Sequence, residues 1–399
     1  MIPSLKRPNV FLFILLLAPF IKPVGIDAFP LADKLYQLWK LGALAYLLVA
    51  LLPKLVQPVA EKRPVGIWGL GIFWAIYIIQ CLRVGVDVGS VAVAAISSLF
   101  VLLLIFYEVR IGNGMIMLRA MAILFTAYII AHISSVILIE TGYLWLGDGA
   151  EGPVYLFGMD NYSAFFLYPM LATVLYYNCL HRGGFGLHGW LLLFGVVGVY
   201  LLTRSMTAAG AGLIMILLLL PQRSWNRLPK IRGIRWMILT MAILLVLICG
   251  FQVQQMLASL LDAMSKGVTL NSRTIIWDHV LRLIRQRPVF GYGSFTAEQI
   301  SKEYVMYGTT HAHNLLLELV LRTGIIGAAA YLWFLFGFAP FGRKSSVPGA
   351  HGVLLVGLVI QLVLSFMDYY PNITVFYMFM GVLYCSGQFL HNAPEEDRT

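Results

Sequence analysis

Charged residues are scarce in this sequence. Asp, Glu, Lys and Arg make up 12% of its 399 residues, against about 25% in an average soluble domain. Hydrophobic residues make up 60%, and the mean hydropathy is +0.83. This composition excludes an ordinary soluble globular protein. It predicts an all-α polytopic membrane protein in which residues 1–399 form a single transmembrane domain.

Cysteine is also scarce. The four cysteines lie scattered in apolar runs, without a Cys-x-x-Cys pair or any cluster with the spacing of metal ligands. We therefore expect neither disulfides nor structural zinc. The candidate site residues described below also lack a neighbouring carboxylate cluster of the kind that holds Mg²⁺ or Ca²⁺. We accordingly expect no metal and no cofactor.

Long hydrophobic runs fill most of the chain. A spanning helix needs about 20 mostly apolar residues, with about 17–25 as the usual range. On that measure the sequence predicts about twelve spans. They cover residues 9–25, 33–56, 64–82, 88–107, 115–140, 161–180, 187–203, 206–221, 234–256, 311–340, 351–367 and 371–391. The polar break at 203–212 is interpreted as a tight reversal between two short helices.

Lysine and arginine in the short loops predict the orientation. With the N-terminus in the cytoplasm, the inside loops carry most cations, including a cluster at 223–235, whereas the outside loop 141–160 carries three acids and no cation. An even number of spans then places both termini in the cytoplasm. The formal net charge of +10 is partly this topology signal and does not indicate nucleic-acid binding.

The longest stretch without a predicted span is the outside loop 257–310, between the ninth and tenth spans. Asn271 and Ser272 can cap a helix from Arg273 to Arg287. Its apolar residues fall at helical spacing on one face: Ile275, Ile276, Val280, Leu283 and Ile284. We expect an amphipathic helix on the outer surface of the membrane domain, ended by Pro288, with a turn at 291–293 and a second short helix over 296–307.

The stretch Thr310-His-Ala-His-Asn314 stands directly before an apolar helix. The positive end of a helix disfavours a charged imidazolium, so His311 or His313 there suits a general base. Only one of the two is expected to face a given site. Asn314 can cap the helix or orient a sugar hydroxyl. The alternative is that both histidines are ordinary interfacial residues near a helix cap.

Several further polar residues are predicted to lie at the same outer face. Arg204 sits between two apolar helices, where an arginine is costly, and Arg273 opens a helix against the helix dipole. Asp368 follows the eleventh span and can add an acid. Arg282 and Arg285 are typical of a solvated face, and we keep them as secondary candidates for substrate binding. The alternatives are snorkelling for Arg204, a solvated charge for Arg273 and an aromatic belt around Asp368.

Arginine forks suit phosphate oxygens, often in a bidentate manner. Two guanidinium groups and a neutral imidazole, without a metal site, are typical of a metal-independent transfer from a diphosphate-activated donor. The rival from another class is a flippase or other transporter of lipid-linked oligosaccharides. A transporter should show paired half-repeats with interrupted helices near the bilayer midplane, and no such repeat is evident in the sequence.

Over most of its length the chain resembles the superfamily of O-antigen ligases and O-antigen polymerases of bacterial inner membranes. The resemblance is strongest at Asn271-Ser-Arg273, Trp277, Pro288, Gly291-Tyr-Gly293, His313-Asn314, Gly324-Ile-Ile-Gly327 and Thr203-Arg204-Ser205. Its length and single large loop make it most similar to the ligases.

The resemblance implies a function in lipopolysaccharide biosynthesis. The ligase would move O-antigen from an undecaprenyl diphosphate carrier to lipid A–core oligosaccharide on the periplasmic side of the inner membrane. His313 would be the catalytic base, and Arg204 and Arg273 would hold the diphosphate. A direct displacement predicts inversion at the anomeric carbon. An O-antigen or exopolysaccharide polymerase of the same superfamily is the alternative.

Overall fold

The computed structural model is built from helices. It describes residues 9–55, 66–139, 142, 153–220, 239–240, 243, 273–296, 298–299, 302, 311–337, 349–368 and 373–389. The first part contains α1 (Val10–Leu17), two 3₁₀ turns, η1 (Ala18–Phe20) and η2 (Val24–Ala28), and then α2 (Pro30–Leu55), α3 (Gly66–Val84), α4 (Val88–Arg110) and α5 (Gly114–Leu138). The second part contains α6 (Asp160–Arg182), α7 (Gly186–Leu202), α8 (Met206–Leu219), α11 (Arg273–Gln286), α13 (Leu315–Phe336), α14 (Ala350–Met367) and α15 (Thr374–Cys385).

Six of these helices are long and apolar enough to cross a membrane, namely α3, α4, α5, α6, α13 and α14. The helices α7, α8, α15 and the segment Val10–Phe20 are apolar but shorter. Their number indicates a multi-pass membrane protein. The expectation of helices is therefore confirmed, whereas the count of about twelve spans is not.

The predicted spans correspond to helices wherever the structure describes them. The ranges 64–82, 88–107, 115–140, 161–180 and 351–367 agree with α3, α4, α5, α6 and α14. The predicted span 234–256, the basic cluster 223–235, the cap at 271–272 and most of the loop 257–310 lie outside the described residues. The single span expected over 311–340 needs correction, because α13 begins only at Leu315 and is interrupted within.

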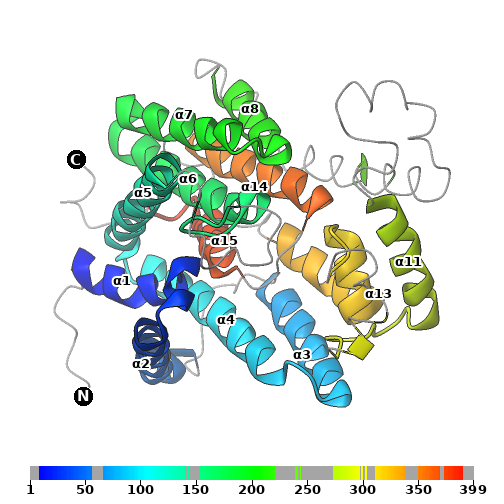
Figure 1. The fold of residues 1–399 in the computed structure, drawn as a ribbon. Coiled ribbons are helices and arrows are strands. Elements are labelled where there is room, and N and C mark those ends of the chain that lie inside the picture. Colours follow the sequence, from blue (N-terminus) through cyan, green and yellow to red (C-terminus); the bar gives the residue numbers. More distant parts are fainter. Residues whose placement is uncertain are drawn as a thin grey trace, which may run out of the picture.

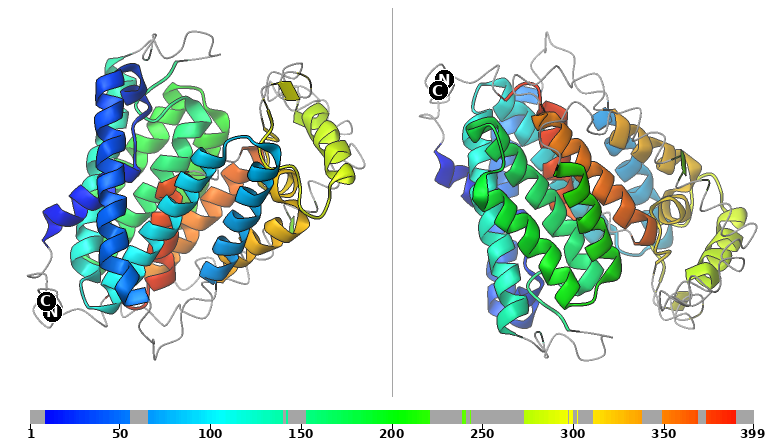
Figure 2. Two further views of the ribbon diagram at one scale, coloured as in Figure 1. Left: turned by 90° about the horizontal axis from the view of Figure 1, so that it is seen from below. Right: turned by 90° about the horizontal axis from the view of Figure 1, so that it is seen from above.

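The helices pack as a bundle, with α11 on its flank (Figures 1 and 2). The closest pairings are α13 with α3, α14 with α6 and α15 with α4, and α11 packs on α13. Buried residues of the bundle form one large hydrophobic core, whereas those around α11 form a second, small cluster. The second cluster includes Trp277, Phe295, Ala312 and Leu317, so it joins α11 to the start of α13.

A break divides α13 at Gly324, whose φ of 66° and ψ of −175° are not helical. The loop after α11 fills this break with its own backbone. The amides of Tyr292 and Gly293 donate to the carbonyl oxygens of Leu321 and Arg322, at 2.9 and 2.8 Å. In return, the Ile325 and Ile326 amides donate to the carbonyl oxygens of residues 288 and 289, at 2.8 and 3.4 Å. The polar groups that a broken helix exposes are thus satisfied within the protein, as a membrane environment requires.

The loop and α13 approach so closely at the break that two positions, Gly291 and Gly324, have no room for a side chain. A Cβ on Gly324 would lie 2.1 Å from Val289 backbone atoms, and one on Gly291 would lie 2.6 Å from Leu321 O. Both glycines also have positive φ angles, at 66° and 67°. A side chain at either position would therefore push the loop out of the break.

The reversal expected between two short helices is confirmed, because α7 ends at Leu202 and α8 begins at Met206. Gly212 allows α8 to pack closely on α6, since a Cβ there would lie 2.4 Å from the Tyr168 hydroxyl. A Cβ on Gly210 would have nothing within 4 Å.

Candidate active site

Ala312, the residue between the two histidines, is hydrogen-bonded through both its carbonyl oxygen and its amide. The indole Nε1 of Trp277, on α11, donates to the Ala312 carbonyl oxygen at 2.9 Å. The Ala312 amide donates to Oε2 of Glu318, on α13, at 2.8 Å. Trp277 and Ala312 are fully buried. Because both bonds are shielded from water, they fix the conformation of the loop that carries the histidines.

The structure brings His311, His313 and Asp368 together. The Oδ1 atom of Asp368 lies 3.4 Å from Nδ1 of His313 and 3.7 Å from Nδ1 of His311. The two imidazole rings have centroids 4.0 Å apart. Asp368 is 5% exposed, whereas the histidine side chains are 21% and 23% exposed, so the rings can be reached from outside.

His313 has an unusual backbone conformation for a residue with a side chain. Its φ is 49°, in the left-handed region that non-glycine residues seldom adopt. Such a conformation costs about 1–3 kcal/mol and persists only where the surroundings fix it. Here the clamped Ala312 precedes His313, and the helix cap Asn314 follows it. In this conformation the His313 imidazole lies beside Asp368.

The backbone amide of His313 distinguishes the two imidazoles. It donates to Nδ1 of His311 at 3.3 Å. The lone pair of His311 Nδ1 therefore has a donor, and a neutral His311 carries its own proton on Nε2. Burial lowers the pKa of His311 below its usual range, and the nearby His313 lowers it further, against the opposing pull of Asp368 and Glu318. His311 is accordingly a neutral imidazole near neutral pH.

Asn314 is the N-cap of α13, as its position suggested. Its Oδ1 accepts from the amides of Leu316 and Leu317 at 3.0 and 3.1 Å. Its Nδ2 donates to the Phe366 carbonyl oxygen of α14 at 3.0 Å. Asn314 is 2% exposed. It therefore ties the histidine loop to the end of α14, two residues before Asp368.

Glu318 and Arg322 form an ion pair one turn apart on α13, with Arg322 Nε 2.8 Å from Glu318 Oε1. Arg322 also donates to the Gly293 carbonyl oxygen at 3.2 Å and lies over the Phe295 ring at 4.9 Å. Because Glu318 also holds Ala312, this pair connects the histidine loop with the loop that fills the break in α13.

Arg273, the first residue of α11, contacts the end of α14. Its Nη1 is 4.0 Å from Sδ of Met367, the residue before Asp368. The structure therefore joins Arg273 to the histidine group through the end of α14.

Arg204 lies in the turn between α7 and α8 and is exposed. Its φ of 57° is also left-handed. The next residue is buried, and Ser205 Oγ donates to Oδ1 of Asn161 on α6 at 2.7 Å. The turn is thus anchored to α6, while the Arg204 side chain projects outward. The structure records no contact between Arg204 and the histidine group.

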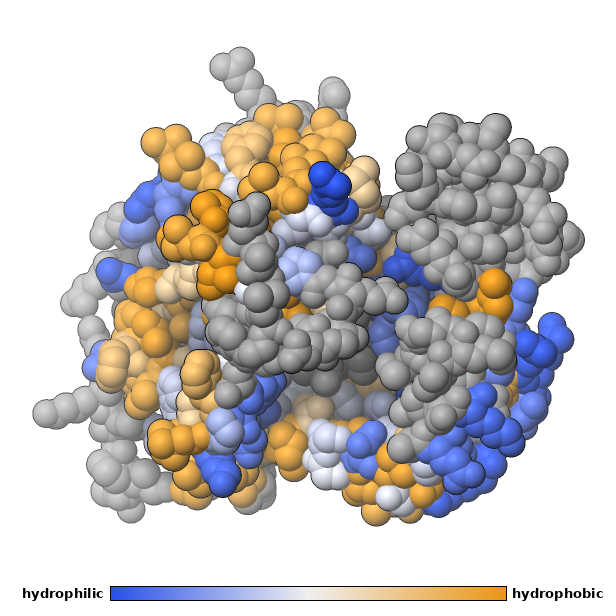
Figure 3. All heavy atoms as spheres, viewed as in Figure 1, coloured by the Kyte–Doolittle hydropathy of each residue, from blue (hydrophilic) through white to orange (hydrophobic). Residues whose placement is uncertain are grey.

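The other arginines of α11 lie on its solvent side. Arg282 and Arg285 are exposed, and hydrophilic residues cover the outer side of α11 (Figure 3). The buried face consists of Ile276, Trp277, Val280 and Leu283. The predicted amphipathic helix is confirmed. The assignment of Ile275 to its apolar face was wrong, because Ile275 is 44% exposed.

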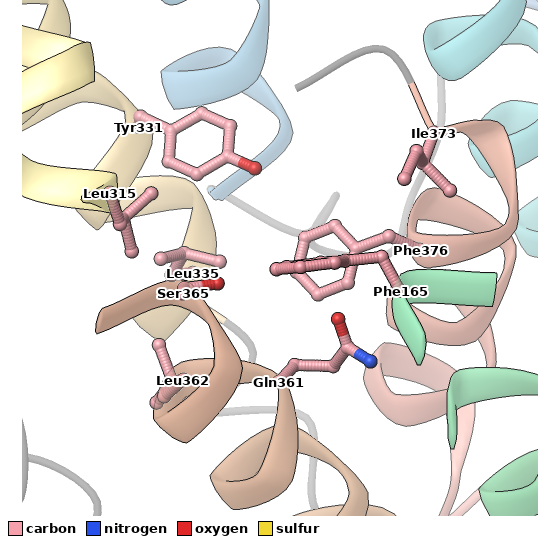
Figure 4. Close-up of a pocket in the computed structure, with 9 residues that line it drawn as sticks. All are labelled: Phe165, Leu315, Tyr331, Leu335, Gln361, Leu362, Ser365, Ile373 and Phe376. Atoms are coloured by element: carbon pink, nitrogen blue, oxygen red, sulfur yellow. The ribbon is translucent and has the colours of Figure 1, made fainter. Parts of the chain in front are cut away.

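An apolar pocket lies beside the start of α13 (Figure 4). It is lined mainly by aliphatic and aromatic side chains of α6, α13, α14 and α15, among them Leu315, Phe165 and Phe376. The Gln361 side chain points into it, and its Nε2 has no hydrogen-bond partner among the described residues. A second pocket shares Leu315, Leu362 and Ser365 with the first and includes Asn314. Together they extend from the helix cap down α14.

Comparison with known proteins supplies the decisive observation. Residues 189–332 match a protein-family model described as O-antigen ligase. This match supports membership of the O-antigen ligase superfamily. The matched region includes Arg204, Arg273, His311 and His313 and ends before Asp368. No curated protein matches the chain.

The match to the O-antigen ligase family suggests a reaction of the glycosyltransferase type on lipid-linked glycans. Sequence analysis missed two groups that shape the site: Trp277 as a donor to the histidine loop, and Glu318 as an acceptor from it. A tryptophan on an otherwise aliphatic amphipathic face was the available signal for the first. No sequence signal indicated the role of Glu318, because its partner is a backbone amide, which nearly every residue carries.

Proposed function

We propose that the protein is an O-antigen ligase. It would transfer O-antigen from undecaprenyl diphosphate to lipid A–core oligosaccharide at the periplasmic side of the bacterial inner membrane. The observation that supports this most directly is the pair of imidazoles at one buried carboxylate, Asp368, with Arg273 in contact with the preceding residue, Met367. That arrangement offers a base for an acceptor hydroxyl and a cation for a diphosphate in one place.

His313 is the base in this proposal. Its Nδ1 faces Asp368, so Nδ1–H can donate to the carboxylate, which leaves the Nε2 lone pair to accept a proton. His311 has its Nδ1 lone pair directed at a backbone amide and its proton on Nε2. His311 is thus suited to donating a hydrogen bond to a substrate oxygen. The geometry therefore favours different roles for the two histidines.

The bonds made and broken are those of a direct displacement. The acceptor hydroxyl oxygen attacks the anomeric carbon of the donor as Nε2 of His313 takes the hydroxyl proton. The bond from that carbon to the diphosphate oxygen breaks, and undecaprenyl diphosphate leaves with the electron pair. Arg273 and Arg204 stabilise the charge that develops on the diphosphate. Attack from the opposite side inverts the anomeric configuration, and no metal is required.

The apolar pockets beside the histidine group support a lipid-linked donor. They begin at Asn314 and Leu315 and run along Leu362 towards Gln361. Their apolar lining is the chemistry that the lipid end of such a donor requires.

An O-antigen or exopolysaccharide polymerase remains the alternative within the superfamily. A transporter of lipid-linked oligosaccharides is the alternative from another class, and the interrupted α13 is the feature that favours it. However, the amides and carbonyls at this break bond to backbone groups of residues 288–293 and are not available to a substrate. These hydrogen bonds favour a structural role for the break in α13 over a role in transport.

The test is a reconstituted transfer reaction. Purified protein is incubated with carrier-linked glycan and either lipid A–core or a second carrier-linked repeat, with and without EDTA, and the products are separated on a gel. We expect glycosylated lipid A–core in both conditions. Elongated carrier-linked glycan would indicate the polymerase. Loss with EDTA and recovery with Mg²⁺ or Mn²⁺ would refute the metal-independent chemistry.

A further inference from the structure

We infer that His311, His313 and Asp368 also form a binding site for a transition-metal ion of the zinc type, and that the bound ion blocks the site. One ligand atom from each residue lies within 4.8 Å of the other two. The Oδ1 atom of Asp368 is 3.4 Å from Nδ1 of His313 and 3.7 Å from Nδ1 of His311. Ligands about 2.0–2.2 Å from a tetrahedral zinc ion are roughly 3.4 Å apart, so little movement is needed.

The donor set determines which ions fit. Two imidazole nitrogens and one carboxylate suit Zn²⁺, Co²⁺, Ni²⁺ and Cu²⁺. Mg²⁺ and Ca²⁺ require six or more ligands, predominantly oxygens, which these three residues cannot supply. Three protein ligands leave a fourth position for water, as in open zinc sites. Each imidazole is more than a fifth exposed, whereas Nδ1 of His313 is buried, so entry of an ion requires a small movement of the rings.

The protein already holds the ligands near the required geometry. The backbone of Ala312 is fixed by Trp277 and Glu318, and Asp368 directly follows α14. The ion would replace one weak contact, the 3.3 Å hydrogen bond from the His313 amide to His311 Nδ1. A site whose ligands are positioned in advance loses little conformational freedom on binding.

The blocking effect rests on the proposed function, in which Nε2 of His313 is the base. A neutral imidazole carries one proton. An ion bound to Nδ1 forces that proton onto Nε2, so no proton is released, but the basic lone pair is lost. The ion also takes the Asp368 oxygen that faces His313. Transfer should therefore stop while the ion is bound and resume when it is removed.

Metal binding can be measured without any substrate. Untagged purified protein is stripped with a chelator, dialysed, and titrated with Co²⁺ while its visible absorption is recorded. We expect the bands of a low-coordinate Co²⁺ site, abolished by Zn²⁺ but not by Mg²⁺. His311→Ala and Asp368→Asn should each weaken Zn²⁺ binding by more than about 10-fold, since even a partner of a metal ligand contributes about 10–100-fold. His188→Ala, at an exposed position of α7, is the matched control and should bind normally.

Absence of these bands, or affinity unchanged in both ligand variants, would overturn the metal site. For the blocking effect, Zn²⁺ should inhibit transfer by the wild-type protein and by His188→Ala alike, and a chelator should restore it. Transfer that continues with Zn²⁺ bound would overturn the blocking effect. If the metal-free protein transfers no glycan, the proposed function fails, while the Co²⁺ titration still decides the metal site.

Discussion

His313 and Arg204 both have left-handed backbones despite carrying side chains, yet their surroundings differ. The histidine stands where three helices meet: α11 holds the preceding carbonyl, α13 holds the preceding amide, and Asp368 after α14 faces the ring. The arginine occupies a turn between two short helices, where only the neighbouring Ser205 is tied to another helix. In the proposed reaction, the first environment would position an atom for proton transfer, whereas the second would present a charge to an incoming ligand.

The largest effect should follow from replacing His313. A general base contributes about 10²–10⁴-fold to a rate, so His313→Ala should lower transfer by that factor while donor binding persists. The matched control is His188→Ala, which removes an exposed histidine remote from the group. Rates measured on purified protein at matched concentration decide the matter. A variant with the wild-type rate would remove the base from the proposed reaction.

The next largest effect should distinguish the arginines. Arg273→Ala should lower kcat by about 10²-fold, the usual cost of removing one group that stabilises a developing anion. Arg204→Ala should also impair transfer severely, and more of its effect should fall on the KM for the donor. Replacement by lysine should restore little at either position, because an ammonium cannot form two parallel hydrogen bonds.

Arg282→Ala is the control for these arginines, because this arginine is exposed on the solvent side of the same helix as Arg273. Its transfer rate should stay close to wild type. Equal losses for Arg282→Ala and Arg273→Ala would show that only the summed charge of the loop matters. The distinction between a positioned cation and a surface cation would then fail.

A smaller effect concerns stability and compares two glycines, one in the break of α13 and one in α8. Gly324→Ala places a Cβ 2.1 Å from Val289 backbone atoms at a positive φ, so we expect a loss above about 2 kcal/mol. Gly210→Ala lies in α8 with nothing within 4 Å and should be neutral or stabilising by up to about 1 kcal/mol. Thermal unfolding of the two variants in the same detergent measures this difference. Equal stabilities would show that the loop does not fill the break in solution.

The smallest expected effect concerns pH. Burial lowers the pKa of His311 in the folded protein, whereas in the unfolded chain it stays near the usual value of about 6.5. The unfolded chain therefore binds this proton first as pH falls, which lowers stability below about pH 6.5 and leaves it unchanged above. His311→Gln should reduce this acid-side loss in apparent melting temperature. A variant with the same slope as wild type would contradict the lowered pKa.

The sequence was sufficient to predict most of the helices, because runs of about 20 apolar residues leave a chain in lipid few alternatives. It also placed the turn at residues 203–205 and the amphipathic helix α11. It did not predict the break in α13. Gly324 lies inside an otherwise continuous apolar run, and the loop that fills the break comes from 30 or so residues upstream. A glycine within a predicted helix was the only local sign.

The candidate site was predictable in composition but not in geometry. The helix-start position of Asn314 follows from its residue type, and its cap is present. That Asp368 meets both histidines depends on the packing of α14 against α13, which spacing along the chain does not encode. In our proposal, the neutral His311 and His313 rings carry their protons on different nitrogen atoms. This difference depends on the backbone amide of His313, which donates to His311 Nδ1.

The central claim is that His313 and Asp368 act as one unit, and a double-mutant cycle tests it most directly. Single-turnover transfer is measured for wild type, Asp368→Asn, His313→Ala and the double variant. If the carboxylate acts by orienting His313 and stabilising its charged form, Asp368→Asn should slow the wild-type protein but add no further loss to His313→Ala. Losses that multiply in the double variant would show that the two residues act independently and would contradict the account.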